Sequence, residues 1–384
     1  MSSYGDVVAC APITVPYVRR SEHDANWWLA AALAALLRAS GLGKQAIDGL
    51  VMASFTLAPD GPAPFTQYVG LSPRLLDFLP TGGASGPMAL RRAARAVQCG
   101  DAEVVACIAG DTLQPGGFRD LVAGFSSFSR DCVWPYGAGG PNQSFAMLTE
   151  HAMRRTGATR EDFGKLCIAQ RSNATRNPDA LLRAPLAMSD YLGARPIASP
   201  LHLYDCVMPC AGAEGFLVMH RARAETLGLR AARILGTIER HNGYPDDPVQ
   251  WRGGWAVDRD TLWQAAGIGP GDVDCVQTYD DYPVIVMMQF EDLGFCAKDG
   301  GPDFIRCHDF TIAGNFPHNT GGGQLSAGQA GAAGGFLGVV EALRQVTGTA
   351  GERQVARVWH ALASGFGMIN YDRGLCTSAV VLGA

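Results

Sequence analysis

Short apolar runs and alanine-rich segments alternate along the first 110 residues of the chain. Val7–Ile13 has the length and character of a β-strand. Ala25–Ala39 has the composition of a helix and ends at Ser40-Gly41, where glycine can adopt the left-handed backbone that closes a helix. A glycine-rich turn at residues 81–86 leads into an alanine-rich helix beginning near Pro87, and strands are predicted at 47–55 and 103–108. This order predicts a mostly parallel α/β sheet with crossover helices.

The same rhythm returns after about residue 225. The predicted elements are strands at 232–238, 274–278, 355–362 and 376–382, and helices at 259–266, 283–293 and 334–345. We therefore predict two halves of similar architecture, 1–225 and 226–384, related by an internal duplication. Residues 112–200 are less regular, include the arginine-containing stretch Arg171–Arg183, and are interpreted as a loop excursion that covers a substrate.

Composition excludes several classes of protein. Hydrophobic residues make up 47% of the 384 residues and charged residues 17%, so the chain is not disordered. The net charge of −5, with no block of Lys or Arg, excludes nucleic-acid binding. Eleven scattered cysteines without a Cys-x-x-Cys pair predict reduced thiols, no metal site and a cytoplasmic protein. We expect neither a signal peptide nor a membrane span, because no apolar run reaches about 18 residues.

Five segments, taken in order, resemble the thiolase superfamily. They are residues 41–51, the turn Gly82-Gly83-Ala84-Ser85-Gly86, residues 205–215, the run Tyr279-Asp280-Asp281-Tyr282, and residues 319–334 with their Asn-Thr-Gly-Gly-Gly opening. The resemblance implies a duplicated αβαβα five-layer sandwich and a homodimer or larger assembly. It also implies a pocket between the halves for a coenzyme A thioester as substrate, with no permanently bound cofactor.

Three departures from the family pattern change the chemistry. Gly83 stands where a thiolase carries its nucleophilic cysteine, and Cys99 lies about 24 Å further along the next helix at 1.5 Å per residue, too far to replace it. Residues 364–367 (Ser-Gly-Phe-Gly) replace the turn with the second catalytic cysteine, and Gln329 replaces the histidine of Gly-His-Pro. Ordinary Claisen chemistry through a covalent thioester is therefore not expected.

What remains is a site that can stabilise a thioester enolate. Retro-aldol cleavage of a β-hydroxyacyl-CoA needs such a site and no acyl-enzyme. In this the chain resembles the cysteine-less, lipid-transfer-protein-like aldolases of steroid side-chain degradation. Tyr279 matches one family tyrosine, whereas the second tyrosine position holds Gln329. The resemblance also implies a small partner protein with a zinc ribbon and an OB-fold.

The catalytic candidates are Tyr279, Gln329, Asn319 and His318, and the substrate-binding candidates are Gly83, Ser85, Gly323, Ser326 and Gly367. We expect Tyr279 to relay the β-hydroxyl proton and Gln329 to donate to the enolate oxygen, the two facing one pocket from opposite sides. Other interpretations stay open. Tyr279 could be a half-buried aromatic at a strand end, Asn319 a turn-former before glycine, and His318 an ordinary loop histidine.

Two other functions fit the same residues. The chain could be an acyltransferase or condensing component that depends on a cysteine of a partner subunit. It could also be a non-catalytic carrier of acyl-CoA or lipid that kept the fold and lost the chemistry. The first predicts a trapped acyl-enzyme once the partner is added, and the second predicts tight binding of acyl-CoA without turnover.

Overall fold

The computed structural model describes residues 4–114, 117, 122, 126–138 and 140–384. Its main sheet contains nine strands in the order β3-β2-β4-β7-β1-β8-β11-β10-β9. The strands are β1 (Val7–Val18), β2 (Gly49–Ala53), β3 (Leu75–Phe78), β4 (Val104–Asp111), β7 (Ala211–His220), β8 (Ala231–His241), β9 (Cys275–Gln277), β10 (His360–Asn370) and β11 (Arg373–Gly383). A small hairpin, β5 (Pro196–Ala198) with β6 (Leu201–His202), stands apart.

The sheet is mixed rather than mostly parallel. Strand β2 runs parallel to β3 and β4, and β9 runs parallel to β10, whereas the long central strands pair antiparallel. The expectation of a mostly parallel sheet came from strands that alternate with helices, and it holds only for pairs joined through helices. Strands β10 and β11 follow each other directly and form a hairpin. The strand expected at 355–362 begins at His360.

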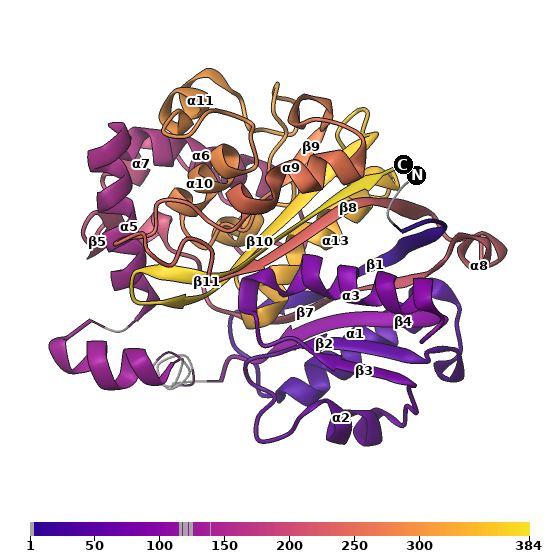
Figure 1. Ribbon diagram of the computed structural model, residues 1–384. Coiled ribbons are helices and arrows are strands. Elements are labelled where there is room, and N and C mark those ends of the chain that lie inside the picture. Colours follow the sequence, from indigo (N-terminus) through magenta and orange to yellow (C-terminus); the bar gives the residue numbers. More distant parts are fainter. Residues whose placement is uncertain (1–3, 115–116, 118–121, 123–125, 139) are drawn as a thin grey trace.

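Three layers of helices alternate with two parts of the sheet, which gives five layers (Figure 1). On one side α1 (Ala25–Ser40) covers the β3-β2-β4-β7-β1 part of the sheet, and on the other α9 (Trp255–Ala266) and α10 (Pro283–Asp292) cover the β8-β11-β10-β9 part. Between them α3 (Ser85–Cys99) packs against α13 (Gly334–Val346). Further helices are α2 (Pro62–Val69), α8 (Arg221–Thr226), α11 (Gly301–Cys307) and α12 (Gly323–Ala327). The predicted αβαβα architecture is confirmed.

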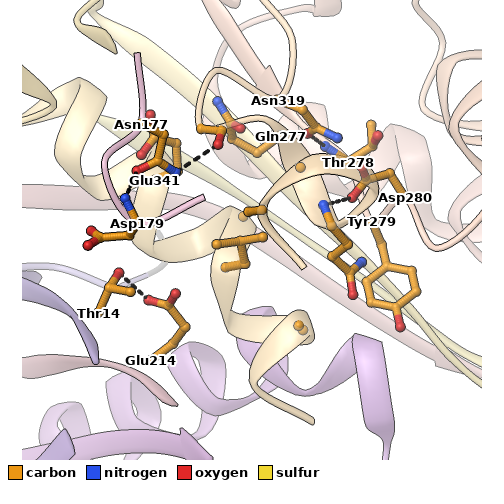
Figure 2. Close-up of a pocket in the computed structure, with 18 of the residues that line it drawn as sticks. Thr14, Asn177, Asp179, Glu214, Gln277, Thr278, Tyr279, Asp280, Asn319 and Glu341 are labelled. Carbon is orange, nitrogen blue, oxygen red and sulfur yellow. Dashed lines mark hydrogen bonds between the residues drawn. The ribbon is translucent and has the colours of Figure 1, made fainter. Parts of the chain in front are cut away.

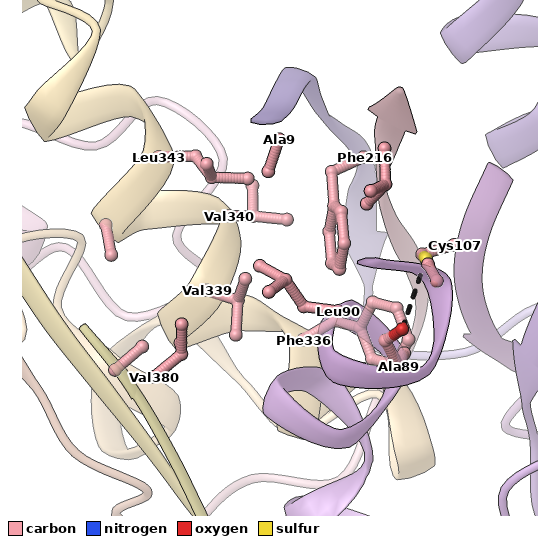
Figure 3. Close-up of a cluster of buried hydrophobic side chains, with 14 of the residues drawn as sticks. Ala9, Ala89, Leu90, Cys107, Phe216, Phe336, Val339, Val340, Leu343 and Val380 are labelled. Carbon is pink, nitrogen blue, oxygen red and sulfur yellow. Dashed lines mark hydrogen bonds between the residues drawn. The ribbon is translucent and has the colours of Figure 1, made fainter. Parts of the chain in front are cut away.

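Alternation along the strands produces these layers. In β4, Val104, Ala106 and Ile108 face α1, whereas Val105, Cys107 and Ala109 face the central helices. Figure 3 shows the central cluster, in which Leu90 of α3 meets Val339 and Val340 of α13. Both halves of the chain therefore share one hydrophobic core. The division at residue 225 itself remains a prediction.

The two central helices approach each other unusually closely at their N-terminal ends. A Cβ added to Gly86 would lie 2.1 Å from the carbonyl oxygen of Gly335, and one added to Gly335 would lie 2.7 Å from that of Gly82. No side chain fits there, so glycine is required at both positions. This contact brings the turn before α3, which contains Gly83, beside the turn before α13, which contains Gln329.

The interpretation of residues 112–200 as a loop excursion is wrong for most of the segment. It contains α5 (Pro141–Thr156), α6 (Arg160–Ala174) and α7 (Met188–Leu192), although residues 115–116, 118–121, 123–125 and 139 lie outside the described part of the chain. The local signals were present. Pro141 occupies the first turn of α5, and Thr159 and Asp162 form a capping box for α6. In the described residues, no helix is both long enough and apolar enough to span a membrane.

Candidate active site

A cavity of about 530 Å³ opens where the two halves meet. Four of the nine predicted residues line it: Gly83, Tyr279, Gln329 and Gly367. They come from four separate segments, namely the turn before α3, the end of β9, the loop between α12 and α13, and β10. The cavity wall is mainly apolar, which suits a hydrophobic acyl group.

Tyr279 and Gln329 are direct neighbours in the wall of this cavity. The Nε2 amide of Gln329 donates a hydrogen bond of 3.0 Å to the Tyr279 hydroxyl oxygen. The prediction that both face one pocket is confirmed, and the prediction that they do so from opposite sides is wrong. Because the tyrosine oxygen accepts this bond, its own O–H is left to donate elsewhere.

Hydrogen bonds fix the backbones of Tyr279 and Gln329 and thereby position both side chains. Gln289 donates to the Tyr279 carbonyl at 2.7 Å and accepts from the Tyr279 N–H at 3.2 Å, and Ser364 anchors the same glutamine at 2.7 Å. Gln329 is fixed in a strand-like bridge, where its N–H donates to the carbonyl of Met208 and its carbonyl accepts from Cys210. The pair is thus preorganised before a ligand enters.

The ring of Tyr279 occupies the space above Gly83. A Cβ added to Gly83 would lie 2.0 Å from Cε2 of Tyr279 and 2.3 Å from the carbonyl oxygen of Phe366. The chain therefore lacks the nucleophilic cysteine and also has no room for it while Tyr279 keeps its position.

Burial controls the ionisation of the site. It raises the pKa of Tyr279 well above 10, with further contributions from the charges of Asp281 and Asp280, so the phenol is neutral at pH 7. Burial also raises the pKa of Asp280 to about 7, against two backbone N–H groups of α12 that favour its charged form. Neither carboxyl is among the site residues expected from the sequence.

Asp281 is the more informative of the two carboxyl groups. It lines the large cavity with Tyr279, is 9% exposed, and its Oδ1 atom has no hydrogen-bond partner in the described part of the chain. Burial, followed by the charge of Asp280, raises its pKa well above the usual value. The signal for it in the sequence was a pair of consecutive acids directly after a buried strand, which is an uncommon pattern for a purely structural segment.

Asn319 and Gly323 line a second, much smaller pocket of about 20 Å³ rather than the large cavity (Figure 2). Tyr279 borders both spaces. Asn319 has a left-handed backbone, with φ of 42°, and its Oδ1 accepts from the Thr278 N–H at 2.9 Å. A Cβ on Gly323 would meet Asp280 Oδ2 at 2.1 Å. In this structure both residues shape the loop behind Tyr279.

His318, Ser85 and Ser326 do not line the cavity, which corrects their placement among the site residues. His318 is fully buried beside Phe290 and Phe310, and its Nε2 pairs with the Thr278 hydroxyl at 2.8 Å. Burial lowers its pKa to about 3, so it stays neutral at physiological pH. The hydroxyl of Ser85 pairs with that of Thr81 at 3.1 Å. The Ser326 hydroxyl accepts a hydrogen bond of 3.0 Å from Nε of Arg171, which lines the cavity.

Comparison with known proteins identifies the family. Residues 259–379 match the family model described as thiolase C-terminal domain-like. A steroid side-chain-cleaving aldolase of Thermomonospora curvata is 31% identical over 92% of this chain and 91% of its own length. The chain belongs to the thiolase superfamily.

Two further relatives resemble this thiolase-superfamily chain over nearly its whole length. A 17-hydroxy-3-oxo-4-pregnene-20-carboxyl-CoA lyase of Mycobacterium tuberculosis is 30% identical over 90% of each chain. A solved Ltp2-ChsH2(DUF35) aldolase superposes with a TM-score of 0.85 at 26% identity, covering 99% of this chain and 98% of the other. The resemblance to cysteine-less thiolase-like aldolases is confirmed.

Proposed function

We propose that this chain is a carbon–carbon lyase that cleaves a β-hydroxyacyl-CoA by a retro-aldol reaction without a covalent acyl-enzyme. The observation that carries the proposal is the ring of Tyr279 over Gly83. The place of the thiolase nucleophile is taken by a phenol that is hydrogen-bonded to Gln329 in a cavity large enough for an acyl group. The names of the relatives, aldolase and CoA lyase, support the same reaction class.

The reaction balances with groups in the cavity wall. Tyr279 accepts the β-hydroxyl proton while it passes its own proton to Asp281, which must start the step in its ionised form, because a phenol with so high a pKa is not ionised at rest. The Cα–Cβ bond then breaks, and its electron pair forms the thioester enolate as a carbonyl forms at Cβ. Gln329 donates its second amide hydrogen to the enolate oxygen. Return of the proton to Cα releases a shorter acyl-CoA and a ketone or aldehyde.

The relatives and the cavity support a more specific proposal for the substrate and partners. We propose a bulky alicyclic acyl group of the steroid class, since two relatives are named for steroid substrates and the cavity lining is mainly apolar. We propose a small partner with a zinc ribbon and an OB-fold, supported by the DUF35 component that the name of the solved aldolase includes. A homodimer and a cytoplasmic location complete the proposal, the latter supported by eleven free thiols.

The deciding experiment compares Tyr279→Phe with the wild type. We expect cleavage of a β-hydroxyacyl-CoA to be lost, with acyl-CoA binding and the melting temperature nearly unchanged, because only the relaying oxygen is removed. Tyr191→Phe is the matched control: Tyr191 is also buried, bonds to Asp205 and lies outside the large cavity. Full activity in Tyr279→Phe would refute the mechanism. Tight binding without any turnover by the wild type, with its partner present, would instead identify a carrier.

Intact-mass analysis distinguishes the lyase from a partner-dependent acyltransferase. We expect an unmodified chain after incubation with acyl-CoA. Two thiols, Cys206 and Cys210, line the large cavity, but burial raises the pKa of Cys206 to about 12 and raises that of Cys210 as well, so neither is a ready nucleophile. A stable acyl adduct on any cysteine of this chain would contradict the proposal.

A further inference from the structure

Arg171 is a buried guanidinium in the wall of the large cavity, and the proposed reaction gives it no task. It lies in the last turn of α6 and is 7% exposed. Its Nε donates to the Ser326 hydroxyl at 3.0 Å, and its Cζ lies 5.8 Å from the centre of the Tyr204 ring. The hydrogen bond fixes the stem of the guanidinium and does not use its two terminal nitrogens.

Within the described residues, those terminal nitrogens have no acceptor, and no carboxylate pairs with the group. Arg353, which is buried to the same extent, shows the usual solution: it forms an ion pair with Glu341 at 3.1 Å and donates to Asn177 at 3.2 Å. A buried charge without a counter-ion is strongly unfavourable. Burial accordingly lowers the pKa of Arg171, although an arginine keeps its proton. The missing counter-ion is therefore expected from a ligand.

The position of Arg171 indicates which part of a ligand supplies the counter-ion. The phosphates of coenzyme A carry several charges and stay hydrated, which suits Arg19, the exposed arginine of the same lining. Arg171 is enclosed, and the lining it shares includes the apolar side chains of Leu182, Val207 and Leu325. A ligand group that reaches Arg171 is therefore buried together with the acyl chain. The two terminal nitrogens of the guanidinium match the spacing of two carboxylate oxygens.

We infer that Arg171 binds a carboxylate on the acyl group, remote from the thioester, so that the preferred alicyclic substrates are CoA monothioesters of dicarboxylic acids. The inference rests on the proposed function only in taking the large cavity as the acyl site. It makes Arg171 a residue that determines substrate specificity.

Calorimetric titration of the whole chain tests this with ligands that cannot be cleaved. The series from succinyl-CoA to sebacoyl-CoA is compared with methyl-terminated acyl-CoAs of the same lengths, from butyryl-CoA to decanoyl-CoA. At the chain length that spans the cavity, we expect the carboxylate ligand to bind about tenfold or more tightly than its neutral partner. Because no ligand carries a β-hydroxyl group, failure of the cleavage reaction would not affect this result.

The variants assign the effect to one side chain. In Arg171→Met the preference for the carboxylate should disappear, in Arg171→Lys it should survive in part, and in Arg19→Met it should be unchanged. Equal affinities of the wild type for the two series at every length would overturn the inference, whether or not the variants fold. Persistence of the preference in a folded Arg171→Met would overturn it too. So would an equal loss of affinity for free coenzyme A in that variant, which would show that Arg171 binds the phosphates.

Discussion

The Cβ position of Gly83 lies within 2.0 Å of the ring of Tyr279, so a nucleophile at residue 83 and a tyrosine at 279 exclude each other in this arrangement. A thiolase carries its nucleophile at the first position, whereas in this chain the ring of Tyr279 fills that space. Loss of the cysteine is thus coupled to gain of a phenol in the same small volume, and a single substitution at residue 83 cannot restore a thiolase.

Substitution of Gly83 tests this exclusion. We expect Gly83→Ala to lower the free energy of unfolding by about 1–3 kcal/mol and to abolish cleavage, because the added methyl group displaces the ring of Tyr279 or the backbone at Phe366. Gly271→Ala is the control, since a Cβ at Gly271 meets nothing within 4 Å. Chemical denaturation and turnover assays measure both effects. A fully active, equally stable Gly83→Ala protein would show that the space is not occupied as described.

Gln329 offers a second test of the site. Gln329→Ala removes the amide that bonds the Tyr279 hydroxyl, and the proposed donor to the enolate oxygen. We expect kcat to fall about a hundredfold or more, with little effect on unfolding. Gln67→Ala, on the exposed face of α2, should leave kcat unchanged. If Gln329→Ala altered only KM, the amide would be a binding group and not a donor to the transition state.

Glu214 predicts a pH dependence of stability. The carboxyl is fully buried, accepts from Thr14 at 2.8 Å and Tyr17 at 3.0 Å, and burial raises its pKa to about 7 (Figure 2). The folded state then binds its proton more tightly than the unfolded state. The stability contributed by this group is therefore present below about pH 4.5 and is lost as the pH rises to about 7, by about 3 kcal/mol.

Glu214→Gln isolates that contribution. We expect the loss of unfolding free energy between pH 4.5 and pH 8 to be smaller in the variant than in the wild type, because the amide cannot ionise. Denaturant titrations across this range measure the difference. Parallel curves for the two proteins would mean that Glu214 ionises in the folded state as it does in the unfolded state.

The assembly is open to a direct measurement. Strand β3 is one of the two terminal strands of the nine-stranded sheet, and its Leu76 residue is 37% exposed. We expect a homodimer in which the sheets continue or stack across the interface, with twice the mass of the chain in sedimentation at micromolar concentration. A monomer at that concentration would contradict this expectation, although it would leave the chemistry of the cavity untouched.

Local sequence patterns predicted most of the secondary structure. The helix expected at 25–39 forms at Ala25–Ser40 and ends at Gly41, whose φ of 69° is the left-handed stop anticipated for it. Patterns failed where a helix start was marked by single residues rather than by apolar periodicity, namely a proline in the first turn of α5 and a capping box at α6. Parallel or antiparallel pairing was also out of reach, because it depends on how strands distant in sequence meet.

The sequence by itself determined that the chain has the layers of a thiolase and no nucleophile at Gly83, since both follow from the order of short motifs. Only the tertiary structure decided which polar residues face the ligand. His318 and Gln329 lie eleven positions apart in one glycine-rich segment, yet the first is buried among aromatic rings and the second bonds to Tyr279 in the cavity wall. That Asp281 and Arg171 line the same cavity was also decided only by the tertiary structure. A cavity is formed where separate segments fail to fill the volume between them, and no local pattern records that volume.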